Sequence, residues 1–113
     1  MAQLPPEKLI LITNLFPRLF EVINLATETE YNLFEQYGET TATIYELDQI
    51  KNAAEWAKSF YNRLYILTLQ VAESQPVASS ATLNLLLQSI EQAQATADAV
   101  EATAQETKRT WGI

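Results

Sequence analysis

Residues 82–111, TLNLLLQSIEQAQATADAVEATAQETKRTW, decide the fold of this chain. Apolar side chains recur in this stretch at intervals of three and four residues, the spacing that aligns a single stripe along an α-helix. The remaining positions are mostly good helix formers and small residues. The pattern therefore predicts one long helix whose stripe contains Leu83, Leu86, Ile90, Ala93, Ala97, Val100, Ala104, Thr107 and Trp111.

The same repeat occurs in two earlier stretches of the chain. It passes first through Leu9, Ile12, Phe16, Leu19, Ile23, Ala26, Glu30, Leu33 and Tyr37, and then through Leu47, Ile50, Ala54, Ala57, Tyr61, Leu64, Thr68 and Val71. We expect helices over about residues 5–37, 42–74 and 79–110, in one domain that spans residues 1–113. Because short connections make neighbouring helices antiparallel, the predicted fold is all-α, an up-down-up bundle of three long helices.

Pro17 lies inside the first of these predicted helices. Proline removes the backbone hydrogen bond to the Thr13 carbonyl group and presses its ring against that group, which costs about 3 kcal/mol in a helix interior. The apolar repeat keeps its phase through Phe16 and Leu19, so we expect a kink at Pro17. The alternative is a complete break, which would give a four-helix bundle.

Several residues suit the ends of the predicted helices. Gly38 is placed to end the first helix in a left-handed conformation. Thr43 and Glu46 have the spacing of a capping box at the start of the second helix. Ser79 or Ser80 is expected to cap the third helix, and Trp111 to cover the pole where that helix ends.

The charge of the chain argues against several classes of partner. Fourteen acidic and seven basic residues give a net charge of −7. Such a chain lacks the basic surface that binds a phosphate backbone, so we expect no nucleic-acid partner. For the same reason we expect no electrostatic docking on anionic membranes. The apolar stretch up to Ala26 is not expected to span a bilayer, because Arg18 and Glu21 interrupt it. Since the chain contains no cysteine and no secretory-signal pattern, we expect a cytoplasmic protein.

The chain offers few side chains for catalysis. It has no histidine and no cysteine, and no phosphate-binding glycine loop. Glutamates 7, 21, 28 and 35 follow one face of the first helix, opposite its apolar stripe, so they are expected to face solvent rather than hold metal. We expect no enzymatic activity, no catalytic, cofactor-binding or metal-binding residues, no cofactor, and no small-molecule substrate.

The strongest functional indication is a surplus of apolar residues at one pole, where the first helix begins and the second ends. One stripe per helix cannot bury all of them, and exposed apolar patches usually mark contact surfaces. We therefore predict a non-enzymatic interaction or structural module that forms a homo-oligomer or binds a protein partner. The predicted interface residues are Ile10, Leu11, Tyr65, Ile66, Leu69 and Leu85.

Two alternatives remain open at this point. Pro17 could bend residues 5–15 across the bundle and bury the same side chains within one chain. The apolar pole could also bind a hydrophobic surface or an apolar ligand instead of a protein. Away from this pole, Trp56 lies beside the stripe of the second helix. We expect it to pack against the edge of the first helix, and the alternative is that it forms a second exposed contact.

Overall fold

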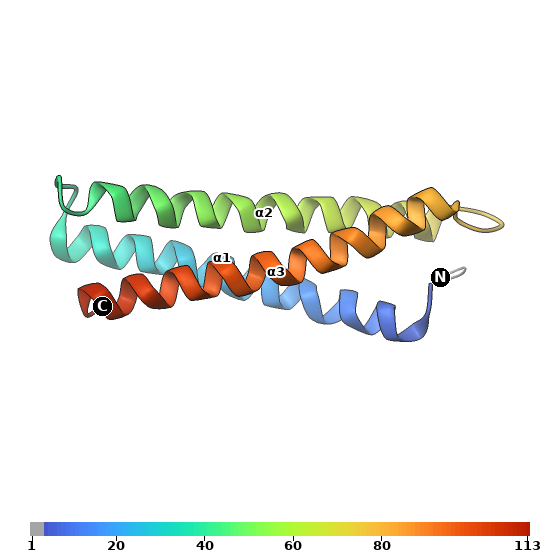
Figure 1. Cartoon of the computed structure of the whole chain (residues 1–113), viewed down its shortest axis with the longest axis horizontal. Helices are drawn as coiled ribbons and strands as arrows, with labels where there is room; N and C mark the ends of the chain where they lie inside the picture. Colours follow the sequence, from blue (N-terminus) through green and yellow to red (C-terminus); the bar gives the residue numbers. More distant parts are fainter. Residues whose placement is uncertain (1–3) are drawn as a thin grey trace.

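The computed structural model is a bundle of three long helices connected in up-down-up order (Figure 1). It describes residues 4–113, and the helices are α1 (Pro6–Tyr37), α2 (Ile44–Glu73) and α3 (Ser80–Trp111). These bounds lie within two residues of those predicted. The bundle measures 56 × 20 × 16 Å, which makes it a rod. An odd number of antiparallel helices places the start of α1 and the end of α3 at opposite poles (Figure 1).

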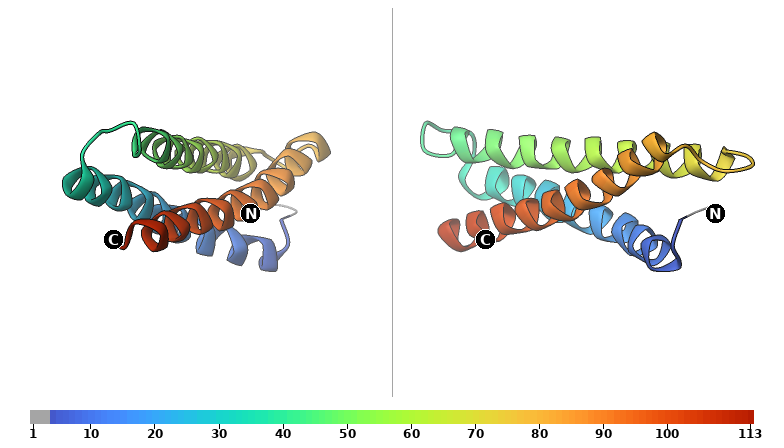
Figure 2. Two further views of the ribbon diagram at one scale, coloured as in Figure 1. Left: turned by 60° about the vertical axis from the view of Figure 1, so that its left-hand side comes forward. Right: turned by 45° about the vertical axis from the view of Figure 1, so that its right-hand side comes forward.

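α1 continues through Pro17 as a single helix of 32 residues. The alternative of a break and a fourth helix is therefore wrong. In both figures the N-terminal part of α1 diverges from the α2–α3 pair (Figure 2). Two residues outside the helices, Leu4 and Ala78, join the buried core at this pole. Part of the apolar pole is thus covered from within the chain, although not by the bent segment that the sequence suggested.

The buried stripes of α2 and α3 follow the predicted ones closely. In α3 the stripe from Leu86 to Thr107 is buried, with Ser89 added to it. In α2 the main difference is that Leu67 is buried whereas Tyr61 and Thr68 are only partly covered. Alanines occupy four core positions at the middle of α2 and α3, where small side chains let helix backbones approach closely: Ala54, Ala57, Ala93 and Ala97.

The predicted stripe of α1 is confirmed at Ile12, Leu19, Ala26 and Leu33, but the other buried positions lie slightly further round the helix than predicted. The buried positions are Ile12, Leu15, Leu19, Val22, Ala26, Thr29 and Leu33. Phe16 and Ile23 lie on the flank of this stripe, and Leu9 and Tyr37 are exposed. α1 carries apolar side chains on two adjacent stripes of its surface. The narrow space between the three helices accommodates Leu15 and Val22, whereas the bulkier Phe16 remains at the edge of the core.

The helix ends agree with the sequence in part. Ser79 caps α3, since its hydroxyl oxygen accepts a hydrogen bond from the Thr82 amide at 3.1 Å. Gly38 has a positive φ of 71°, but its ψ of −178° is not that of a left-handed helical residue. The predicted capping box at Thr43 is absent, since its side chain makes no hydrogen bond to the first turn of α2. Its hydroxyl instead donates to the Gly38 carbonyl oxygen at 2.6 Å and accepts from the Thr40 amide at 2.9 Å. Thr43 therefore fixes the α1–α2 turn instead of the first turn of α2.

The far pole is covered as expected by Trp111. Its ring lies 5.1 Å from the ring of Tyr37, centroid to centroid. The Tyr37 hydroxyl also donates a hydrogen bond of 2.9 Å to the Trp111 carbonyl oxygen. These contacts join the last turn of α1 to the last turn of α3.

Candidate interaction surface

Five of the six residues predicted to form an interface are exposed in the bundle. Their exposed fractions range from 41% at Leu69 to 59% at Ile10, with Tyr65, Ile66 and Leu85 in between. Leu11 differs, because it is partly buried against the core. Large side chains of this kind lose favourable burial energy when they remain in water, so the rod carries considerable apolar surface.

The structure distributes these exposed residues over different sides of the rod. Ile66 and Leu85 line one shallow depression between α2 and α3, together with Arg63 and Leu67. Tyr65 lies on the other side of α2, where its ring is 6.5 Å from that of Phe16 on α1. On α2, Tyr65 therefore lies toward α1 and Ile66 toward α3.

A cluster of aromatic rings lies where α1 and α2 meet. The ring of Tyr61 is 5.1 Å from the ring of Phe16, in an edge-to-face arrangement, and 4.9 Å from the ring of Phe20. Together with Tyr65 these rings form a surface cluster, within which Phe20 is 58% exposed. Aromatic pairs of this geometry favour a fixed arrangement. The cluster is thus an ordered apolar surface.

Sequence reasoning missed Phe20 because it considered only one stripe on α1. A second stripe lies beside the core stripe, at Phe16, Phe20, Ile23, Thr27 and Phe34. Its spacing of three, four and seven residues is also helical, and this regularity could have revealed it. A helix with two adjacent apolar stripes can pack against two different neighbours.

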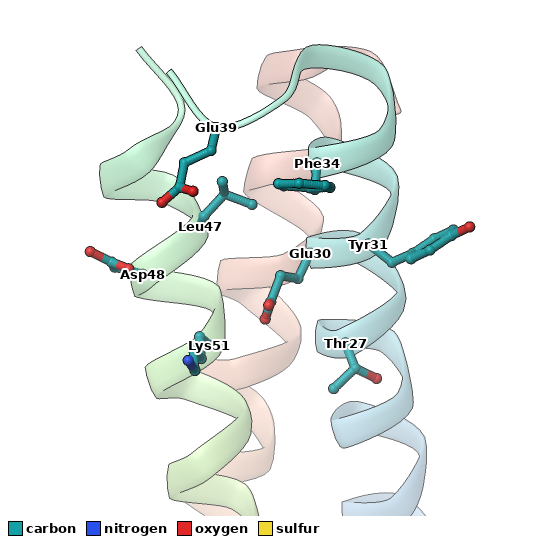
Figure 3. A pocket seen from close by; sticks show the side chains of 8 residues that line it. All are labelled: Thr27, Glu30, Tyr31, Phe34, Glu39, Leu47, Asp48 and Lys51. Carbon is teal, nitrogen blue, oxygen red and sulfur yellow. The ribbon is translucent and has the colours of Figure 1, made fainter. Parts of the chain in front are cut away.

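A groove of about 420 Å³ also lies between α1 and α2, nearer the end of α1 (Figure 3). Phe34 points from α1 toward Leu47 of α2, Glu30 points into the groove, and Tyr31 points away from it. Lys51 and Asp48 line the α2 side. We call this whole side of the molecule, from Phe16 and Tyr65 to Phe34 and Ile44, the α1/α2 face.

The α1/α3 side of the rod is polar by comparison. The Arg18 guanidinium lies 2.6 Å from Asp98 and 3.1 Å from Glu101, both on α3. The hydrogen bond that the Arg18 guanidinium donates to the Asp98 carboxylate raises the pKa of Arg18 above its ordinary value. This ion pair joins α1 to α3, and we assign it no catalytic role.

The α2/α3 side carries one further exposed aromatic residue, Trp56. It was expected to pack against α1, and this expectation is wrong, because its side chain is 66% exposed. It lines a shallow groove with Ala53 and residues of α3, including Val100. The heptad position of Trp56 directs it to the flank of α2 that faces α3.

The carboxylates of the described residues form no group of three or more that could hold a metal ion. Within the same residues, α1 is the one helix long and apolar enough to cross a membrane, and 28% of its most apolar window is buried in the bundle. The charges of Arg18 and Glu21 therefore do not exclude α1 from the helices whose length and composition would let them cross a membrane.

No protein-family model, no curated protein and no solved structure matches this chain.

Proposed function

We propose that this protein is a non-enzymatic interaction module that associates with itself through its exposed apolar surface. The observation that carries the proposal is the exposed aromatic cluster of Phe16, Phe20, Tyr61 and Tyr65 where α1 and α2 meet. Aromatic residues are over-represented at the centres of protein interfaces. A surface of this kind gains free energy when a partner removes it from water.

The same features argue for binding rather than catalysis. The grooves between the helices are shallow and open, whereas enzyme sites are usually enclosed and bring several polar groups together. The groove on the α1/α2 face contains Glu30, Asp48 and Lys51 but no histidine or cysteine that could act near neutral pH. We therefore propose a role in assembly, with no cofactor and no small-molecule substrate.

Sedimentation velocity over a range from about 1 to 100 µM tests this proposal. We expect the fraction of a defined oligomer to rise with concentration, because most protein associations of moderate area fall within such a range. A single species with the mass of one chain across the whole range would contradict self-association. Circular dichroism of the same samples verifies that the chain remains helical.

A second candidate function is binding to a hydrophobic surface such as a lipid bilayer. It is favoured by the apolar composition of α1, most of whose apolar window is not buried in the bundle. Flotation with liposomes distinguishes the two functions. A monomer that floats with the vesicles would support the second candidate, whereas an oligomer that remains in solution would support the first.

A further inference from the structure

The α1/α2 face has a pattern of side chains that is complementary to itself. We propose that this face binds a second copy of the chain in antiparallel orientation, with Thr27 on the twofold axis. The inference rests on the proposed self-association and specifies its geometry. Because a twofold interface uses the same patch on both copies, each residue must meet a suitable residue of that same patch.

The α1 side of the face is symmetric about Thr27. Phe20 lies seven residues before Thr27 and Phe34 lies seven residues after it, so all three lie on one strip of the helix surface. In an antiparallel pair of α1 helices centred at Thr27, Phe20 of one copy meets Phe34 of the other. The small threonines meet each other at the centre, which allows the two helices to approach.

The α2 side of the face carries four charges in a matching order. Asp48, Lys51, Glu55 and Lys58 follow one side of the helix, with the two signs alternating. In an antiparallel pair of α2 helices centred at residue 53, Asp48 lies opposite Lys58 and Lys51 lies opposite Glu55. Each of these four charges then faces one of the opposite sign, the arrangement that fixes partner and orientation in interfaces.

The two patterns share one centre in space. The ring of Phe20 is 4.9 Å from that of Tyr61, and Phe34 lies beside Leu47 in the groove (Figure 3). Since α1 and α2 are antiparallel, these two contacts place Thr27 level with residue 54. This is one residue from the centre of the charge pattern, so a single twofold axis satisfies both helices.

The size of the face is also that of a stable dimer interface. Phe20, Phe34 and Tyr65 are each 51–58% exposed, and Ile44 is 39% exposed. With side-chain areas of about 200 Å² for aromatic residues, the exposed apolar area is on the order of 400 Å². A standard interface uses about 800 Å² on each partner, of which somewhat more than half is apolar. A second copy therefore covers this face with the expected proportion of apolar area.

A single-cysteine variant tests the position of the axis. The natural chain has no cysteine, so Thr27→Cys introduces one thiol, and on the twofold axis it meets its own equivalent. We expect most of the oxidised protein to become a disulfide-linked dimer whose mass is seen on a non-reducing gel. Glu28→Cys is the matched control, because its side chain is also exposed but points about 100° around α1 from Thr27 and should give little cross-linking.

Charge-reversal variants test the antiparallel pairing on α2. Lys51→Glu with Lys58→Glu makes the α2 strip entirely acidic, and Asp48→Lys with Glu55→Lys makes it entirely basic. We expect each variant alone to dimerise at least about tenfold more weakly than the natural chain, and an equimolar mixture to form the heterodimer. Ile66→Asp with Leu85→Asp, on the α2/α3 side, should leave the dimer intact.

The outcomes separate this inference from the broader proposal. If the natural chain is an oligomer but Thr27→Cys and Glu28→Cys cross-link equally, and the charge variants still associate, the proposed face is wrong and self-association stands. Loss of the dimer in the Ile66→Asp, Leu85→Asp variant would place the interface on the α2/α3 side. A natural chain that stays monomeric at 100 µM, or that instead floats with liposomes, would contradict both.

Discussion

The Arg18 guanidinium on α1 forms an ion pair with the Asp98 carboxylate on α3, with Nη2 2.6 Å from Oδ1. The same nitrogen lies 3.1 Å from Glu101. Eighty residues separate Arg18 from Asp98, so this contact depends on the packing of α1 against α3. It is the clearest polar link between these two helices in the part of the chain that the structure describes.

Replacing Arg18 with methionine should destabilise the bundle only slightly, by less than about 1 kcal/mol. Both carboxylates are about half exposed or more, and water and salt screen such pairs. Chemical denaturation in urea at low salt and in 1 M NaCl measures the effect, and the difference from the natural chain should shrink at high salt. Arg63→Met, at an exposed site of α2 with no ion pair among residues 4–113, is the control. Because methionine keeps most of the apolar stem, a salt-independent loss above about 2 kcal/mol would contradict the assignment of this pair as a weak, screened surface contact.

Two positions on α2 should respond very differently to truncation. Leu64 is fully buried and Ile66 is 53% exposed, although they are two residues apart. Leu64→Ala removes core contacts and leaves a cavity, so we expect a loss of about 2–5 kcal/mol in the free energy of unfolding. Ile66→Ala should cost less than about 1 kcal/mol. Urea denaturation at a low protein concentration measures both, and equal losses would show that Ile66 is buried in solution.

Ser89→Ala should make the protein more stable by about 1 kcal/mol. The Ser89 side chain is 1% exposed, and its hydroxyl has no hydrogen-bond partner among the described residues. Alanine removes this unpaired group and is also the better helix former. Thermal unfolding followed by circular dichroism provides the measurement. The exposed Ser59→Ala controls for helix propensity, and a Ser89→Ala protein no more stable than this control would indicate that the hydroxyl is bonded in solution.

Pro17→Ala should also stabilise the chain, by up to about 3 kcal/mol. Pro17 is an exposed residue inside α1, and alanine restores the backbone hydrogen bond to Thr13 that proline cannot make. Pro6→Ala is the matched control. Pro6 lies in the first turn, where proline is favoured, so its replacement should not stabilise. If Pro17→Ala lowers the melting temperature, the direction that proline gives to α1 is needed for packing the core.

Much of the bundle could be predicted because helix period, caps and breakers are local properties. In α3 the apolar and small residues from Leu86 to Thr107 form a single stripe on one face of the helix, and this stripe is buried as predicted. α1 was different, because Leu15 and Val22 compete with Phe16 and Ile23 for the core. The spacing of the residues does not indicate which of two adjacent stripes is buried, since both stripes are equally regular.

The candidate surface could be predicted less well, for a related reason. The surplus of apolar residues at one pole was visible in the sequence, and Ile10, Tyr65, Ile66, Leu69 and Leu85 are indeed exposed. Their division between the two sides of α2 was not visible. The aromatic cluster needed both helices in place, because Phe20 and Tyr61 are far apart in the chain and become neighbours only when α1 packs against α2.

The amino-acid sequence by itself determined three helices, their order and their approximate ends, because these depend on side-chain periodicity and on prolines, glycines and caps close by in the chain. It also determined the acidic charge and the absence of histidine and cysteine. Only the tertiary structure decided which face of α1 is buried and which apolar side chains remain together on the surface. Those properties depend on how much volume three packed helices enclose, and no single helix contains that information.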